Sequence, residues 1–595
     1  MSVELDQEEE LAAARLDRAT ARRLLSLAKP VAKGLCLLAL VQVILATSIV
    51  IRPWFLSQVI DHGHERAGDG MWIASLMLGL GATWLVRFGG GGFAQWLAGS
   101  IALRVLGDLR ACLHDHVLNL SVSYFDRTRA GRIVARIDRD VESLEPALVN
   151  LVPELLGTLL RCIAAGIIIY CMDPVLLLYL CPLLPLLLIA MMLFKRLGSA
   201  MWGRVAEFKS RVTAHLCETI TGVRVIQQCA AEKTNSDRYV KLLSDLDHSA
   251  MAASWAWGWF APFTFALNIF GICALIVAGG IHLAEGQLTL GQIAQCIFYV
   301  FLFLGPLQEL GELYERCATA AAAAQRVFLL LDTQAQVIDQ QGAMPLPLVQ
   351  GSVDFEAVRF GYVAGREILH GIDLHIQTGE TVALVGPTGH GKSTLVQLLC
   401  RFYDPNSGTV SIDGHDLRSV SMDSLRRQIS VVLQDNVLFS GSIYDNLRMA
   451  KPEASDAELD KAVVALGADE ILLRLPQGLN TSVGPAGTGI SLGQRQLVCL
   501  VRAFLANPRV LVLDEATSSI DLHTEGRLQR ALRRLCKGRT SIIVAHRLAT
   551  IRHAHRIVVI QDGKIAEQGT HEQLMLAGGV YAGLYKAATE AAGES

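Results

Sequence analysis

Six long apolar segments in the N-terminal half constrain the fold of this chain more than any other feature. They run approximately over residues 34–57, 71–94, 149–171, 174–195, 257–282 and 289–312. Each is long enough, or nearly so, to cross about 30 Å of hydrocarbon as a helix. The whole-chain composition agrees, since 52% of residues are hydrophobic and 18% are charged. The sequence therefore predicts an α-helical membrane domain with six transmembrane helices.

The connections between these segments differ in length and charge. Three are short, near 58–70, 172–174 and 283–288, and they carry a single arginine, Arg66. Two are long, polar and helix-like, at about 95–148 and 196–256. Basic residues gather in the N-terminal tail and the long loops, for example Arg22, Arg23, Arg127, Arg129, Arg132, Arg136, Lys195 and Arg196. The positive-inside rule then places both termini and both long loops in the cytoplasm. Residues 15–29 form either an amphipathic helix on the membrane surface or a solvated tail.

The pattern changes near residue 340. Short apolar runs alternate with helical stretches from about residue 350 onward, and they predict a soluble α/β domain with buried strands. The expected strands are 353–355, 381–385, 429–433, 510–513, 541–544 and 557–560. The expected divisions are a tail with a possible elbow helix at 1–33, a transmembrane domain at 34–317, a linker at 318–350, an α/β domain at 351–585 and a C-terminal tail at 586–595.

Charge and cysteine content exclude several classes of protein. The net charge of -3 gives no reason to expect a nucleic-acid partner. The 13 cysteines are scattered without metal-like spacing, and they imply neither a disulfide framework nor a cysteine metal site.

A phosphate-binding loop follows one of the predicted strands. The strand "TVALV" runs into "GPTGHGKST", residues 386–394, which fits G-x-x-x-x-G-K-[ST] between a strand and a helix. Backbone N–H groups of such a loop surround phosphate oxygens, and the helix N-terminus adds a favourable field. Lys392 can reach the β and γ phosphates, and the Ser393 hydroxyl can bind Mg²⁺. The nucleotide-contacting residues expected here are Gly386, Thr388, Gly389, Gly391, Lys392, Ser393 and Thr394.

Two carboxylates end a later apolar strand. In "RVLVLDEATSSID", Asp514 and Glu515 stand where a magnesium ligand and a base for the attacking water are needed. His546 in "SIIVAHRL" follows another strand, from which an imidazole can touch the γ-phosphate or orient water. Together with the loop at 386–394, these residues indicate ATP hydrolysis.

The order of these motifs resembles the ATPase domain of ABC transporters over residues 351–585. The whole chain resembles a half-transporter of the type IV exporter class. The resemblance implies that Tyr362 stacks on adenine and that Gln434 is the Q-loop glutamine, which senses Mg²⁺ and the membrane domain. "ISLGQ" resembles the LSGGQ signature motif and contributes Ser491, Gly493 and Gln494. "SSID" resembles the D-loop and contributes Asp521. The implied catalytic residues are Glu515, His546 and Gln434; the implied metal ligands are Ser393, Gln434 and Asp514.

The first long loop carries a weaker resemblance to the exporter pattern F-D-x-x-x-x-G-x-x-x-x-R-x-x-x-D. The matching residues are Phe125, Asp126, Gly131, Arg136 and Asp140. In that family, short coupling helices in the two long loops dock on the ATPase domains. The expected places are residues 127–134 and 230–239.

The resemblance also implies a dimer. Each ATP is held between one chain's phosphate loop and the other's signature motif, so a second chain is required, either identical or different. ATP, with Mg²⁺, closes the dimer, and hydrolysis reopens it, which alternates access to the membrane cavity. The implied location is an integral position in a bacterial inner membrane.

Three positions depart from the family pattern. His390 occupies a phosphate-loop position usually held by a small residue, and tolerance is expected because backbone groups bind the phosphates. Pro485 replaces the glutamate of the exporter X-loop, which affects one contact with coupling helices. Leu492 replaces the first glycine of the signature motif. A functional motif is still expected, because Ser491 and the helix N-terminus make the nucleotide contacts.

Charged residues within the apolar segments are the candidates for substrate contact, because burial in lipid is costly. They are Arg87, Glu154 and Arg161, with Gln308, Glu309 and Glu312 near the end of the sixth segment. Interhelical pairing explains them equally well. The favoured function is ATP-driven export or flipping of an amphipathic compound. The alternatives are import of a siderophore-like compound by the same fold and, in another class, an ATP-gated channel or regulatory subunit.

Overall fold

The computed structural model describes residues 18–593 except residues 67, 364, 434–435, 515–521 and 545–551. The chain divides into two compact units. The helical unit comprises Met1–Leu118 and Ala130–Thr333, and the α/β unit comprises Asn119–Arg129 and Gln334–Ser595. The short segment Asn119–Arg129, from the first long loop of the membrane half, therefore belongs to the α/β unit.

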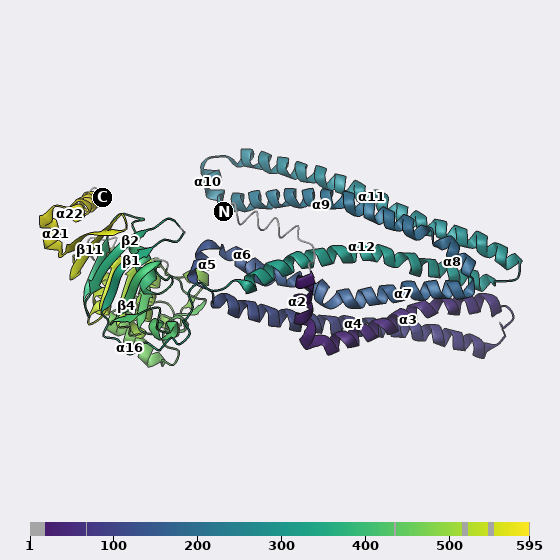
Figure 1. Cartoon of the computed structure of the whole chain (residues 1–595), viewed down its shortest axis with the longest axis horizontal. Coiled ribbons are helices and arrows are strands. Elements are labelled where there is room, and N and C mark those ends of the chain that lie inside the picture. The colour runs from purple at the N-terminus through teal and green to yellow at the C-terminus, as the bar shows by residue number, and fades with distance from the viewer. Residues whose placement is uncertain are drawn as a thin grey trace. The chain divides into compact units, whose positions relative to one another are not determined.

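The helical unit is built from long helices and a few short ones (Figure 1). They are α2 (Arg18–Ala28), α3 (Ala32–His62), α4 (Gly70–Leu118), α6 (Ala130–Ala135), α7 (Leu151–Met172), α8 (Pro174–Leu180), α9 (Leu183–Thr221), α10 (Val223–Gln228), α11 (Glu232–Ala284) and α12 (Leu290–Asp332). Two short π-helical turns, Arg136–Asp140 and Pro146–Asn150, lead into α7. All six predicted apolar segments lie in these elements, and the fourth is divided between α8 and α9.

Five helical segments in the described part of the chain are long and apolar enough to cross a membrane. They are Lys29–His62, Gly70–Leu118, Pro153–Met172, Pro174–Phe194 and Glu232–Ala284, and a shorter apolar stretch, Leu290–Gly305, begins α12. The predicted helical membrane domain is thus confirmed.

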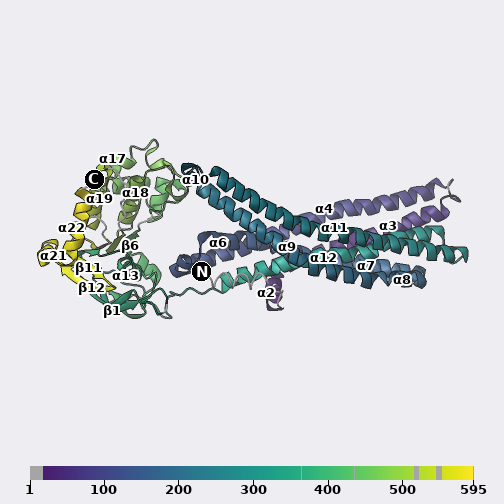
Figure 2. The ribbon, with the colours of Figure 1, turned by 90° about the horizontal axis from the view of Figure 1, so that it is seen from above.

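Two helix groups make up the helical unit. Helices α3, α4, α7 and α12 pack on one another, while α9 and α11 lie side by side along most of their length and are joined by α10 (Figure 2). Asp61 near the end of α3 fixes the start of α12, because its carboxylate accepts hydrogen bonds from the Thr289 hydroxyl at 2.6 Å and the Gly291 N–H at 2.7 Å. Asp140 accepts two hydrogen bonds from Arg326 of α12, at 2.7 and 2.9 Å.

The α/β unit contains a mainly parallel sheet in the order β12-β11-β3-β10-β9-β6. Its strands are β3 (Thr381–Val385), β6 (Ile429–Val432), β9 (Val510–Asp514), β10 (Thr540–Val544), β11 (Arg556–Gln561) and the antiparallel β12 (Lys564–Gly569). An antiparallel sheet, β2-β1-β4-β5, comprises β1 (Val353–Phe360), β2 (Leu369–Ile376), β4 (Ser407–Ile412) and β5 (His415–Asp416). β7 (Gly441–Ser442) pairs with β8 (Ser482–Val483). The predicted α/β domain is confirmed.

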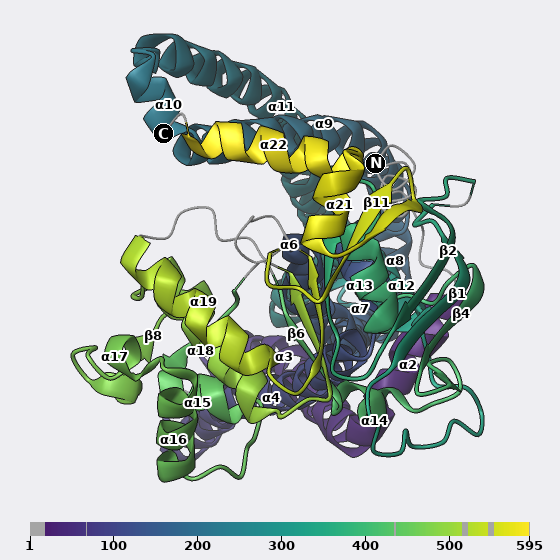
Figure 3. The ribbon, with the colours of Figure 1, turned by 90° about the vertical axis from the view of Figure 1, so that its left-hand side faces the viewer.

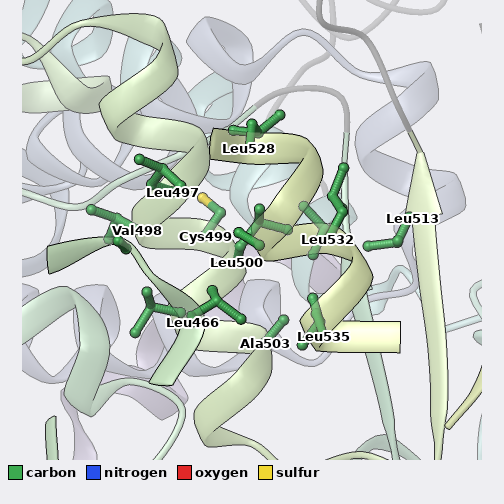
Figure 4. Close-up of a cluster of buried hydrophobic side chains, with 14 of the residues drawn as sticks. Leu466, Leu497, Val498, Cys499, Leu500, Ala503, Leu513, Leu528, Leu532 and Leu535 are labelled. Atoms are coloured by element: carbon green, nitrogen blue, oxygen red, sulfur yellow. The ribbon is translucent and has the colours of Figure 1, made fainter. Parts of the chain in front are cut away.

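The α/β unit also contains helices, which, apart from α5, complete two apolar cores. They are α5 (Val122–Arg127), α13 (Lys392–Leu399), α14 (Met422–Arg426), α15 (Ile443–Arg448), α16 (Asp456–Leu466), α17 (Asp469–Leu472), α18 (Leu492–Leu505), α19 (Leu522–Cys536), α21 (His571–Ala577) and α22 (Val580–Gly593). Helices α18 and α19 lie side by side (Figure 3). Leu497 and Leu500 of α18 and Leu528 and Leu535 of α19 are fully buried in this core (Figure 4). The strands of the parallel sheet are buried because helices cover them.

The structure differs from the expected divisions in three places. Helix α12 continues to Asp332, so the non-helical connection begins at Thr333, well after the expected linker start at 318. The short helix of the second long loop is α10, Val223–Gln228, whereas the expected stretch 230–239 lies almost entirely in α11. In the first long loop, the short helix α6, Ala130–Ala135, lies mostly within the expected 127–134 but begins three residues later and ends one residue later, and α5 precedes it.

The connection between α12 and β1 is held on the α/β unit by Arg401, whose side chain is 1% exposed. Its guanidinium donates to the carbonyls of Val420 at 2.8 Å and Ile338 at 3.0 Å. The carboxylates of Asp339 and Asp404 each lie 3.4 Å away. A buried cation with these partners fixes the segment that leads into β1.

We expect Arg401→Met to destabilise the α/β unit by about 3 kcal/mol or more, because removing one member of a buried charged network leaves the other groups unpaired. The measurement is thermal unfolding of the purified chain in detergent. Arg427→Met is the matched control, since Arg427 pairs with Asp423 at 3.0 Å on the surface and both side chains are more than three-quarters exposed; it should change stability by less than about 1 kcal/mol. Equal effects of the two substitutions would contradict the anchoring role of Arg401.

Candidate functional site

The predicted phosphate loop leaves the carboxyl end of β3 and enters α13. Gly386 and Gly391 have φ values of 150° and 101°. A Cβ at Gly386 would lie 2.1 Å from the Ile560 carbonyl oxygen, and one at Gly391 would lie 2.6 Å from a Leu369 methyl carbon. The loop conformation therefore requires glycine at 386 for steric and torsional reasons and favours it at 391 through the positive φ.

Lys392, the first residue of α13, is buried against this loop. Its ammonium donates to the carbonyls of Gly386 at 2.7 Å and Pro387 at 2.8 Å. Burial lowers the pKa of Lys392, while the negative charge of Asp514 acts in the opposite direction. An ammonium has three protons, so one remains for an anionic ligand of the loop.

Strands β3, β10 and β9 run parallel, so their carboxyl ends lie along the same edge of the sheet. Asp514, the last residue of β9, therefore lies at the edge where the phosphate loop leaves β3. Ser393, next to Lys392, is an exposed residue in the otherwise buried first turn of α13. A hydroxyl and a carboxylate are oxygen donors of the kind that Mg²⁺ prefers. These two residues therefore fit a magnesium ion bound beside the phosphates.

Four of the expected site residues, Gln434, Glu515, Asp521 and His546, lie outside the described residues. Their sequence neighbours are described: Glu515 directly follows the end of β9, and His546 comes two residues after β10 ends at Val544.

Tyr362 lies beside the phosphate-loop helix. Its hydroxyl donates to the Thr394 hydroxyl at 3.2 Å and contacts the Gln397 side chain. Its ring meets Phe360 and Tyr403 edge to face, with centroids 5.0 and 5.1 Å apart. Burial raises the pKa of Tyr362, which keeps the hydroxyl protonated.

The segment Asn119–Arg129 contacts this aromatic group within the α/β unit. The Tyr403 hydroxyl donates to the Asp126 carboxylate at 2.6 Å, and Arg127 donates to the Tyr362 carbonyl at 3.2 Å. Burial and this hydrogen bond both raise the pKa of Tyr403. Sequence reasoning missed Tyr403 and Gln397. The aromatic run "RFY" after α13 was a possible signal for Tyr403.

The signature-like segment begins α18. The Ser491 hydroxyl accepts a hydrogen bond from the Gln494 N–H at 3.3 Å, and the Gln494 side chain accepts one from the Ser491 N–H at 2.8 Å, which is a capping box. Gly493 is buried, and Leu492 is a half-buried first helical residue with ordinary, negative φ. Within the described residues, no hydrogen bond or ion pair joins residues 491–494 to the phosphate loop.

A separate pocket of about 480 Å³ opens among α3, α4 and α7 of the helical unit. Its polar lining consists of Gln42, Arg87, Gln95 and Glu154, beside Trp84 and the glycines Gly91 and Gly92. Two of the predicted substrate candidates, Arg87 and Glu154, thus share one pocket. Arg161 does not line this pocket. Its guanidinium donates to the Thr158 hydroxyl at 3.0 Å and to the Gly157 carbonyl at 3.3 Å, both on its own helix. The side chains of Gln308, Glu309 and Glu312 lie outside the described residues.

A helical membrane unit joined to an α/β unit with a phosphate loop defines a membrane-bound ATPase. Residues 35–307 match the ABC transporter transmembrane region, and residues 369–518 match the ABC transporter ATPase family. The chain belongs to the ABC transporter family, with both parts fused as in exporter half-transporters.

Known relatives and one solved structure agree with this assignment. The chain is 38% identical to a fatty acid ABC transporter ATP-binding/permease protein of Mycobacterium bovis over 475 residues, 80% of this chain and 75% of that protein. It is 33% identical to an ATP-dependent lipid A-core flippase of Syntrophus aciditrophicus over 570 residues, 95% of this chain and 94% of that protein. A bacterial Atm1-family ABC exporter with ATP bound superposes with a TM-score of 0.78 at 26% identity, covering 96% of this chain and 99% of the exporter. The chain is therefore an integral membrane protein whose ATPase domain binds ATP and drives transport, as predicted.

We expect Leu492→Gly to change the ATPase rate only modestly, by less than about threefold. Leu492 has helical backbone angles, and the substitution costs roughly 1 kcal/mol of helix propensity at most. The measurement is steady-state ATPase activity of the reconstituted transporter. A rise of about a hundredfold or more would show that the native leucine impairs the signature motif.

Proposed function

We propose that this chain exports an amphipathic compound, or flips it between leaflets, as one half of a dimer. The dimer works by alternating access, and each ATP lies between the phosphate loop of one chain and the Ser491–Gln494 segment of the other. The main support for this substrate class is a pocket in the helical unit. Arg87, Gln42 and Gln95 line it, although they belong to the apolar helices α3 and α4.

Arg87 lies in the apolar span of α4, and its side chain is exposed in the single chain. In the described part of the chain, no carboxylate forms an ion pair with Arg87. The carboxylate of Glu154, which also lines the pocket, lies 3.8 Å from the guanidinium of Arg316 in α12. An unpaired guanidinium facing lipid is costly, so such residues face water-filled cavities or ligands. Arg87, two glutamines and Trp84 suit a compound with a polar, anionic head and an apolar tail.

The names of two relatives support the same class. One is called a fatty acid transporter and the other a lipid A-core flippase, and both names describe anionic amphiphiles. Since the relatives with these names are bacterial, we place the chain in a bacterial plasma membrane, with both termini in the cytoplasm by the positive-inside rule.

In the proposed ATP cycle each part of the site has a separate task. The loop at residues 386–391 and Lys392 bind the β and γ phosphates, and Tyr362 stacks on adenine. Ser393, Asp514 and Gln434 hold Mg²⁺, which neutralises phosphate charge. Glu515 is the base for the attacking water, and His546 contacts the γ-phosphate. The Asp521 side chain belongs to the dimer interface.

Glu515→Gln should leave ATP binding intact and lower turnover by about a hundredfold or more, because the amide cannot accept the proton of the attacking water. ATP binding and steady-state hydrolysis are measured on the reconstituted dimer. Asp469→Asn, on a surface helix away from the phosphate loop, serves as the control for loss of a carboxylate. Robust hydrolysis by the Glu515 variant would remove that residue from its proposed role.

Filling the pocket tests the substrate site. A Cβ at Gly91 or at Gly89 meets no atom within 4 Å, yet only Gly91 lines the pocket. Gly91→Leu should therefore abolish stimulation of the ATPase by oleate while basal hydrolysis stays within about twofold of wild type. Gly89→Leu, the matched control on the same helix, should retain the stimulation, since both substitutions favour helix equally.

Two results would count against the pocket. One is an unchanged oleate response in Gly91→Leu, and the other is an equal loss in both variants. Failure of oleate to stimulate the wild-type protein at all would instead argue against a fatty-acid-like substrate.

A further inference from the structure

His390 is the residue of the phosphate loop that departs from the small side chain expected there, and the structure shows what its imidazole contacts. The Asp562 N–H donates a hydrogen bond to His390 Nδ1 at 2.8 Å. The Asp562 carboxylate lies farther away, 3.4 Å from the same nitrogen. Because a backbone N–H can only donate, Nδ1 is the acceptor and the neutral ring carries its proton on Nε2.

Asp562 belongs to the tight turn between β11 and β12, which is itself well fixed. Gly563 in that turn accepts a hydrogen bond from the His370 N–H of β2 at 2.9 Å. A Cβ at Gly563 would lie 2.1 Å from the Ile368 carbonyl oxygen, so the turn is pressed against the strand that carries His370. His390 therefore ties the phosphate loop to a rigid part of the α/β unit.

The rest of the loop tip has few constraints of its own. In the described part of the chain, Thr388 and Gly389 form no hydrogen bond, and a Cβ at Gly389 would meet no atom within 4 Å. Gly389 and Gly391, on either side of His390, both have positive φ, 87° and 101°. Two glycines around one residue make a segment with large conformational freedom, and ordering such a segment around a ligand costs free energy.

We propose that His390 is a positioning residue that orders the phosphate loop before ATP binds, through its hydrogen bond to the β11–β12 turn. A loop held in its bound shape loses less entropy on binding, so the affinity for the nucleotide rises. The bond is the same in the bound ground state and in the transition state, so it acts on ATP binding and leaves the rate of hydrolysis unchanged. This inference rests on the phosphate-loop role given under the proposed function.

The substitutions His390→Leu and His390→Asn form a matched pair. Both side chains branch at Cγ like histidine, but asparagine can place its Oδ1 where Nδ1 accepts the hydrogen bond, and leucine has no acceptor. We expect His390→Leu to raise the dissociation constant for TNP-ATP and the KM for ATP by about three- to tenfold, the worth of one hydrogen bond, with kcat within twofold. His390→Asn should restore both values to near wild type.

The measurements use the full chain, reconstituted in nanodiscs, and His390→Ala replaces the leucine variant if the latter does not fold. Asp562→Asn keeps the backbone N–H and removes the carboxylate, so it should bind TNP-ATP like the wild type. Equal affinities of the leucine and asparagine variants, a fall in kcat at constant KM, or a loss of affinity in Asp562→Asn would each overturn the proposal.

Lys392→Ala separates this inference from the proposed function. If Lys392→Ala loses TNP-ATP binding while His390→Leu binds normally, only the role of His390 is wrong. If Lys392→Ala itself binds TNP-ATP like the wild type, the phosphate-loop assignment is wrong and the His390 proposal falls with it.

Discussion

The hydrocarbon core of the membrane is the constraint on which the architecture of this chain depends. Backbone polar groups cannot bind water there, so each crossing segment must satisfy its own hydrogen bonds as a helix. Helices α3, α4, α7 and α11, the segment Pro174–Phe194 of α8 and α9, and the apolar start of α12 follow from that requirement. Residues such as Asp61 and Asp140 then fix the helix ends, through Thr289 and Gly291 in one case and Arg326 in the other. Burying a charged side chain among membrane helices costs free energy. For this reason, the pocket around Arg87 is the main support for the proposed substrate class.

In the α/β unit, phosphate binding depends on backbone geometry more than on side chains. Gly386 and Gly391 allow the loop to turn against β11 and β2, and Lys392 closes onto the loop carbonyls. Contacts to neighbouring segments hold this geometry: His390 of the loop accepts a hydrogen bond from the β11–β12 turn, and Tyr362 contacts Thr394 and Gln397 of α13. The segment Asn119–Arg129 joins the same group through Asp126 and Tyr403. Tyr362, which is proposed to stack on adenine, contacts this segment directly through Arg127 and indirectly through the Tyr403 ring.

Much of this organisation could be predicted from local sequence. The apolar segments, the strands that flank the phosphate loop and the motif order are short-range signals, and they led to the correct fold class and family. β2, β4 and β12 were missed because they pair antiparallel in partly exposed positions, where their alternating residues resemble loop sequence. The linker was expected to start at residue 318, but α12 continues to Asp332, and the short helix of the second long loop, α10, lies before the expected stretch 230–239.

Contiguous residues are enough to show that the chain spans a membrane and carries a phosphate loop, since hydropathy and a strand–glycine–helix pattern are local properties. The folded chain is needed to see which distant residues meet: Arg401 with Ile338, Tyr403 with Asp126, and His390 with Asp562. It also shows that Arg87 lines a pocket, whereas Arg161 is held by its own helix. The physical reason is that a side chain's partners depend on how its helix is rotated and on the register of remote strands. Neither quantity is encoded in the identity of one residue or its neighbours.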